Sequence, residues 1–215
     1  MLYWLFQILK SIFLLVLPFI ILIRGAVYFH SEYHLHPWAA LLGGAGAAML
    51  VLFIYLTFVH GRFTGKIGSK KTFKRRGLIV LVLVLGYCVH GLFFLSSKNT
   101  KAEEVRTEFT NLHPILRLGV STIVFLDRDL IITDASRFPE DYKKMGLPRK
   151  GRSLHYKQSN GFAHALDLRT NGRSEFRNTL LKGYFWAMGF NTLRHVGTGD
   201  HLHISLQSHD TPGAI

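Results

Sequence analysis

Three long apolar stretches constrain the fold of this chain more than any other feature. Residues 37–59 and 77–95 carry no charged side chain, and residues 2–23 carry a single one. Each stretch is long enough to cross about 30 Å of hydrocarbon as an α-helix. Arg24 follows the first stretch and no small-residue cleavage site does, so we expect a retained helix rather than a cleaved signal peptide. The sequence therefore predicts three transmembrane helices within residues 1–96.

The positive charge of the chain is concentrated beside these stretches. The net charge is +13, and seven Lys or Arg residues lie in 62–76, between the second and third apolar stretches. Basic loops of membrane proteins stay in the cytoplasm. We therefore expect the N-terminus and this loop inside the cell and everything after residue 95 outside it. Because topology accounts for the basic run, we expect no nucleic-acid partner.

The small residues GGAGAA, at 43–48, form a smooth surface on the second predicted helix. Small residues let helix backbones approach closely within a bilayer. We expect this surface to pack inside the three-helix bundle; an oligomer formed through the transmembrane helices is the alternative.

Residues 97–215 have the composition of a soluble domain, with twelve acidic and seventeen basic residues against one and nine in residues 1–96. The single cysteine, Cys88, lies in the third apolar stretch, which excludes a disulfide and a cysteine-rich zinc site in this domain. Apolar periodicity predicts an α+β domain with a small antiparallel sheet. The expected helices are 105–125, interrupted near Pro114, and 174–188; the expected strands are 129–134, 161–168, 190–194 and 201–206, and 138–150 is expected to be a loop.

Histidine and aspartate residues gather in the last third of the chain, at His155, His164, Asp167, His195, His201 and His203. Imidazole and carboxylate are the usual zinc ligands outside cysteine-rich sites. Side chains two residues apart share a face of a strand, so Asp167 and one of His201 or His203 are expected to converge across neighbouring strands. His155 would complete three protein ligands from the preceding loop. An accidental cluster among the twelve histidines of the chain is the alternative.

The segment RSLHYKQSNGFAHALDL, residues 152–168, resembles the zinc-binding element of the D-Ala-D-Ala carboxypeptidase and dipeptidase family, which shares its fold with the hedgehog signalling domain. The resemblance implies that His155, Asp167 and, within GDHLHISL, His203 bind zinc. It extends over residues 111–206, most of the outer domain, and it has no counterpart in the membrane part.

Four further residues are candidates for roles in the reaction, and the resemblance implies the roles of two of them. Arg137, within LIITDASRFP, matches an arginine that supports charge on the substrate carbonyl. Asp200, three residues before His203, matches the catalytic acid–base residue. From their positions, His201 is expected to assist the reaction or to orient Asp200, with a role as a strand-surface residue as the alternative, and Ser153, two residues before His155, is expected to contact the substrate.

Two departures from the family pattern leave alternatives open. Twelve residues lead from His155 to Asp167, more than in the family, so we interpret KQSNG at 157–161 as an insertion and keep His164 as the rival ligand. Asp200 stands where the family has glutamate, which is one methylene longer.

These features together predict a membrane-anchored zinc metallopeptidase. The expected substrates are D-Ala-containing stem peptides of peptidoglycan, and the expected location is a bacterial cytoplasmic membrane, with the C-terminal domain facing the periplasm or the cell exterior. The alternatives are a catalytically inactive zinc-binding recognition domain and a membrane scaffold protein.

Overall fold

The structure is a computed structural model and describes residues 2–65, 67–144, 146, 148, 151–197 and 199–215. Lys66 of the basic loop and Thr198, between the last two expected strands, lie outside the described residues. Three helices are each long and apolar enough to cross a membrane, which confirms the prediction of a membrane part. They are α1 (Leu2–Tyr33), α2 (Pro37–Thr64) and α3 (Lys70–Phe93).

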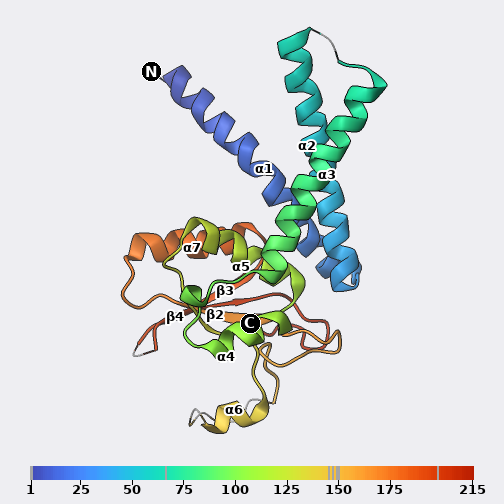
Figure 1. Cartoon of the computed structure of the whole chain (residues 1–215). Helices are drawn as coiled ribbons and strands as arrows, with labels where there is room; N and C mark the ends of the chain where they lie inside the picture. Colours follow the sequence, from blue (N-terminus) through green and yellow to red (C-terminus); the bar gives the residue numbers. More distant parts are fainter. Residues whose placement is uncertain (1, 66, 145, 147, 149–150, 198) are drawn as a thin grey trace.

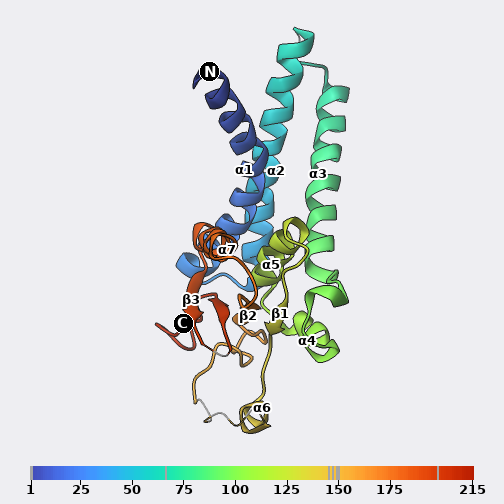
Figure 2. The same cartoon turned by 90° about the vertical axis from the view of Figure 1, so that its left-hand side faces the viewer.

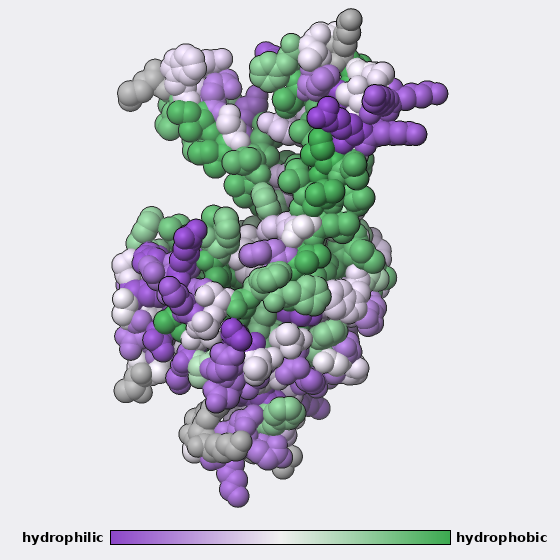
Figure 3. Space-filling model, in the orientation of Figure 1, coloured by the Kyte–Doolittle hydropathy of each residue, from purple (hydrophilic) through white to green (hydrophobic). Residues whose placement is uncertain are grey.

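The three helices do not end where the apolar stretches end. The α1 helix continues past Arg24 to Tyr33, and α3 begins at Lys70 inside the basic run. A helical backbone satisfies its own hydrogen bonds in water as well as in lipid, so only the part inside hydrocarbon must be apolar. Figure 3 shows this division as an apolar band between two hydrophilic ends.

The rest of the described chain forms an α+β unit, as predicted. Its helical segments are η1 (Ser97–Asn99), α4 (Glu103–Glu108), η2 (Phe109–Asn111), α5 (Pro114–Leu126), α6 (Pro139–Lys144) and α7 (Glu175–Ala187). Its strands are β1 (Ile132–Asp134), β2 (Ala165–Arg169), β3 (Asn191–His195) and β4 (His201–Ser205).

The short α6 helix was not expected, because it lies in the segment that was predicted to be a loop. Pro139 begins the helix, where a missing N–H costs nothing. The carboxylate of Asp141 accepts a hydrogen bond of 2.7 Å from the N–H of Phe138 and so caps the first turn. Pro114, by contrast, agrees with the prediction: the helical segment is interrupted before this residue, and α5 begins at it.

The sheet has the strand order β1-β2-β4-β3, and all neighbouring strands are antiparallel. Its two faces differ in polarity. Leu166, Leu168, Leu202 and Ile204 lie on one face and are fully buried, and Figure 1 shows α5 and α7 between the sheet and the membrane helices. Strand alternation puts Asp167, His201 and His203 on the opposite face. The sheet therefore separates an apolar layer from a polar layer.

The apolar layer is continuous with the membrane helices. The hydroxyl of Ser121 in α5 donates a hydrogen bond of 2.7 Å to the carbonyl of Gly91 in α3, and Arg117 donates one of 3.2 Å to the carbonyl of Leu92. A Cβ atom at Gly91 would lie 2.6 Å from Leu118, so α3 and α5 approach closely. Figure 2 shows α5 beside the lower end of α3. One hydrophobic core thus joins the membrane part to the outer part.

The α1 and α2 helices pack closely through the predicted stretch of small residues. A Cβ atom at Gly44 would lie 2.3 Å from the carbonyl oxygen of Leu22 and 2.8 Å from the backbone nitrogen of Ala26. Gly44 therefore packs within the bundle, as expected. An oligomer formed through the remaining small residues stays a prediction.

Candidate metal centre

Two adjacent strands place Asp167 and His203 side by side. The two residues are direct partners in the register of β2 and β4, and both side chains are buried. Nδ1 of His203 lies 2.8 Å from Oδ1 of Asp167. The convergence that strand alternation predicted is therefore present, with His203 rather than His201 as the direct partner.

His155 reaches the same point from the loop before β2. Residues 157–161 fold back on themselves: the N–H of Gly161 bonds to the carbonyl of Gln158 at 2.8 Å, and the N–H of His164 bonds to the carbonyl of Leu154 at 2.7 Å. The additional residues therefore form a turn and leave the ends of the loop close together. Nε2 of His155 lies 3.5 Å from Oδ1 of Asp167 and 3.3 Å from Nδ1 of His203.

These three donor atoms fit a single transition-metal ion. Ligands about 2.0–2.1 Å from a tetrahedral zinc ion lie about 3.3 Å from one another. The three separations in the cluster are 2.8, 3.3 and 3.5 Å. The site joins two imidazoles and one carboxylate, which is a ligand set of catalytic zinc centres.

Neighbouring groups orient the donor atoms. Nδ1 of His155 donates a hydrogen bond of 2.8 Å to the carbonyl of Ala135, which leaves the Nε2 lone pair for a metal. Burial raises the pKa of Asp167, but in the absence of a metal hydrogen bonds from His155 and His203 outweigh it and hold the pKa well below its usual value; a bound ion would take the place of these protons. Asp167 is therefore an anion, the form in which a carboxylate binds a cation.

Arg137 lies in this cluster, but its guanidinium faces carboxylates. One terminal nitrogen is 3.0 Å from Oδ2 of Asp167, and Nε is 2.8 Å from Oδ1 of Asp134. Burial opposes the charge of Arg137, yet the two carboxylates raise its pKa above the ordinary value. Arg137 holds the second oxygen of Asp167, which frees the first for the metal, and this is a positioning arrangement that the sequence did not suggest.

Asp200 does not lie in the cluster, contrary to expectation. Its carboxylate accepts hydrogen bonds of 2.6 Å from Thr170 and 2.9 Å from Arg194. Asp200 precedes β4 and lines the same cavity as Asp167 and His201, but its carboxylate is paired with Arg194 and Thr170 instead of the three clustered side chains. The bonds from Arg194 and Thr170 lower the pKa of Asp200 to about 2, which makes it a weak base.

Ser153 and His201 have different surroundings. The Ser153 hydroxyl is buried, lies 2.8 Å from the hydroxyl of Tyr142, and accepts a bond of 3.3 Å from the N–H of His155. Ser153 therefore fixes the turn that carries His155. His201 is partly exposed, and its Nε2 lies 3.8 Å from Oδ2 of Asp167. Of these two residues, His201 faces the open side of the centre.

An open cavity of about 1050 Å³ adjoins this side of the centre. The described residues that line it include Glu104, Glu108, Asp134, Arg137, Asp141, Asp167, Arg169, Asp200 and His201. Asp167 and His201 are both part of this lining, so a substrate in the cavity would contact them. The cavity is the place where a reacting group could approach the metal.

Glu108, at the end of α4, is a functional candidate that the sequence reasoning missed. Burial raises its pKa to about 7, with repulsion from Asp134 and Asp141 acting in the same direction. A carboxyl group with this pKa exchanges a proton at neutral pH, which suits general acid–base chemistry. In the sequence, Glu108 is one glutamate in a polar segment and nothing there marks it as functional. Asp134 and Asp141 are distant in the sequence and lie near it only in the folded chain.

The rival ligand, His164, lies elsewhere. Its Nδ1 donates a hydrogen bond of 3.0 Å to the carbonyl of Gln207, and its ring faces His30 and His113. The ligand position beside Asp167 and His203 is therefore occupied by His155 and not by His164.

In comparisons with known proteins, no family model, no curated protein and no solved structure matches this chain.

Proposed function

We propose that this chain is a membrane-anchored zinc metallopeptidase that hydrolyses D-Ala-containing stem peptides of peptidoglycan. The observation that carries the proposal is the set of three donor atoms, 2.8–3.5 Å apart, beside an open cavity. The resemblance of residues 152–168 to the D-Ala-D-Ala carboxypeptidase and dipeptidase family supplies the reaction class and the substrate.

The residues of the centre have different proposed roles in hydrolysis. His155, Asp167 and His203 hold the ion, and Arg137 fixes Asp167 from the second oxygen. A bound zinc ion supplies a water of lowered pKa and polarises the scissile carbonyl. His201 lines the cavity beside Asp167, and its Nδ1 donates to the carbonyl of Gly199, so Nε2 would donate a hydrogen bond to the oxygen of the scissile carbonyl only from the protonated ring.

Glu108 replaces Asp200 as the proposed general base. A base of pKa about 7 holds a proton or releases it at neutral pH, whereas Asp200, with a pKa of about 2, is ionised throughout that range and binds Arg194. Glu108 would take the proton of the attacking water and return it to the leaving amine. Its place on the wall of the cavity supports this role.

The charge of the cavity bears on the substrate. Six acidic residues and three Lys or Arg residues are among the described residues that line it, so the cavity does not share the positive charge of the whole chain. This lining favours the amino groups of a peptide over its carboxylates. We therefore propose that the side-chain amine of the diamino acid in a stem peptide, rather than its carboxylates alone, is recognised.

The proposed location follows from the helices and the charge. The N-terminus and the joined ends of α2 and α3 lie on one side, far from the sheet (Figure 1). Phe176, Leu180 and Trp186 of α7 are exposed, and Figure 1 shows α7 on the side of the outer part nearest the membrane helices. An outer part that rests on the extracytoplasmic leaflet of a bacterial cytoplasmic membrane would put these side chains against lipid and the cavity toward the wall.

A recognition domain without hydrolytic activity is the second candidate. The observation in its favour is Asp200, whose expected catalytic place is taken by an ion pair with Arg194. Such a domain would bind zinc and stem peptides with the same residues and cleave nothing.

One experiment separates the two candidates. The full chain, purified in lipid nanodiscs and loaded with zinc, is incubated with stem peptides ending in D-Ala-D-Ala, and the products are identified by mass spectrometry. We expect cleavage that a chelator abolishes and zinc restores. Asp167→Asn and Glu108→Gln should both be inactive, but only Glu108→Gln should retain zinc at the centre formed by His155, Asp167 and His203. Zinc binding and peptide binding without any cleavage would support the recognition domain and reject the peptidase.

A further inference from the structure

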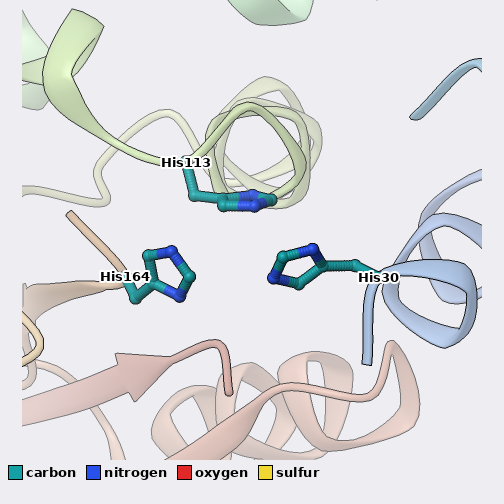
Figure 4. A group of neighbouring side chains, drawn as sticks. All are labelled: His30, His113 and His164. Carbon is teal, nitrogen blue, oxygen red and sulfur yellow. The ribbon is translucent and has the colours of Figure 1, made fainter. Parts of the chain in front are cut away.

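A second group of histidines lies where the membrane part meets the outer part. His30 comes from the end of α1, His113 is the residue before α5, and His164 is the residue before β2. The three side chains are 2%, 0% and 1% exposed. Figure 4 shows the three rings around a common space, and one nitrogen of each lies within 4.8 Å of the others.

The nitrogens of this group are only partly satisfied. Nδ1 of His30 donates to the carbonyl of Leu35 at 3.0 Å, and Nδ1 of His164 donates to the carbonyl of Gln207 at 3.0 Å. This leaves Nε2 as the lone-pair nitrogen in both rings, the arrangement that orients metal-binding histidines. Nε2 of His30 and Nε2 of His113 are buried without a hydrogen-bond partner. Buried polar atoms without partners are rare, and each points to a missing group.

We propose that His30, His113 and His164 form a second metal site, which binds a transition-metal ion with affinity for imidazole, copper or zinc. Three imidazoles suit these ions, whereas magnesium and calcium require oxygen ligands. The site is distinct from the centre at Asp167, because strand alternation at β2 directs His164 and Asp167 to opposite faces of the sheet.

Two contacts must change when the ion binds. Nε2 of His164 is 2.9 Å from the side-chain nitrogen of Asn160, a residue of the partly exposed turn before β2, and this bond is replaced by the metal. Nδ1 of His113 accepts a bond of 3.3 Å from the N–H of Ile115, which the ring gives up when its proton moves from Nε2 to Nδ1. In exchange, Nε2 of His30 and Nε2 of His113, which are buried without hydrogen-bond partners, would each bind the metal.

The protonation of the rings agrees with this assignment. Burial lowers the pKa of His164 to about 4 and lowers that of His113 well below its ordinary value. Both rings are therefore neutral at neutral pH and need not lose a charge before they bind metal. The site would link α1 to the outer part through a metal, in addition to the apolar core.

Metal stoichiometry tests the proposal on the full chain in detergent. The protein is stripped of metal and titrated separately with Zn²⁺ and with Cu⁺, against competing chelators. Asp167→Asn serves as the background in which the first centre is weakened. We expect this variant to retain one tightly bound ion, and Asp167→Asn with His113→Ala to lose it, with affinity at least about 100-fold weaker. His60→Ala, a histidine near the end of α2, is the matched control and should change nothing.

X-ray absorption keeps the test valid if His113→Ala does not fold. The metal-loaded Asp167→Asn protein should show nitrogen neighbours only, at about 2.0 Å. Absence of a tight ion in Asp167→Asn, an oxygen-dominated shell, or a folded double variant that retains the ion would overturn the second site. Failure of the first centre gives a different result. In that case the wild type would hold one ion, which Asp167→Asn would retain and His113→Ala would lose. Failure of the centre at Asp167 can therefore be distinguished from failure of the second site.

Discussion

Nδ1 of His203 lies 2.8 Å from Oδ1 of Asp167, across two strands in which the residues are direct partners. The carboxylate provides the only negative charge among the three proposed ligands, and its other oxygen is held by Arg137. Asp167→Asn keeps the shape of the side chain and removes the charge.

We predict that Asp167→Asn weakens zinc binding at the first centre by at least about 100-fold, because loss of even a residue that only orients a ligand costs about 10–100-fold. Competition with a chromophoric chelator measures the effect. Asp129→Asn, at an exposed carboxylate, is the control and should bind zinc as the wild type does. Equal affinities in the two variants would show that Asp167 is not a ligand.

Glu108 gives the proposed reaction its dependence on pH. A general base works only in the ionised form, and the raised pKa of about 7 means that this form increases as the pH rises through neutrality. We predict that kcat rises with an apparent pKa near 7. Glu108→Gln should remove this limb and lower kcat by a factor of about 100 to 10,000.

Glu104→Gln is the matched control for Glu108, since Glu104 lines the same cavity from the start of the same helix. It should leave both the rate and the pH profile unchanged. If Glu108→Gln kept the acidic limb, another group would be the base.

Asp200 is predicted to be structural. Its bonds to Arg194 and Thr170 hold its pKa near 2, so it stays ionised across the working range and contributes no titration there. We predict that Asp200→Asn lowers hydrolysis by much less than the factor of about 100 that loss of a general base produces. Steady-state kinetics at pH 7 would measure this, and a loss of that size with zinc retained would return Asp200 to the role that the resemblance implies.

The orientation in the membrane is open to a direct test. Seven basic residues in 62–76 predict that this loop is cytoplasmic and that the C-terminus is outside. A periplasmic reporter fused after Ile215 should be active, and the same reporter inserted beside Gly68 should be inactive. The reverse pattern would contradict both the orientation and a wall substrate.

The parts of the fold that depend on local periodicity could be predicted from the sequence. Apolar length identified the three helices, and the two-residue period of a strand put Asp167 and His203 on one face. Pro114 marked the start of α5 because proline lacks the N–H that a helix interior requires. These properties belong to a residue and its immediate neighbours.

The parts that depend on distant partners could not be predicted. A separation of three residues from His203 suggested a catalytic role for Asp200, but the carboxylate is bound by Arg194 and Thr170. Nothing near Glu108 in the sequence indicates the burial that raises its pKa, or the two aspartates, Asp134 and Asp141, that act in the same direction.

The second histidine group could not be predicted from the sequence for the same reason. His30 and His113 lie 83 positions apart in the sequence, and only the docking of α1 against the outer part brings their rings to 4.6 Å between centroids.

The contact between α3 and α5 has a consequence for how the protein is made. Ser121 and Arg117 obtain their hydrogen-bond partners from carbonyls at the end of a membrane helix, and His30 reaches its two neighbours from another. Residues 97–215 therefore lack part of their core and part of one histidine group when they are synthesised alone. We expect the outer part to mature only after the helices have been inserted, so that membrane insertion acts as the last step of its folding.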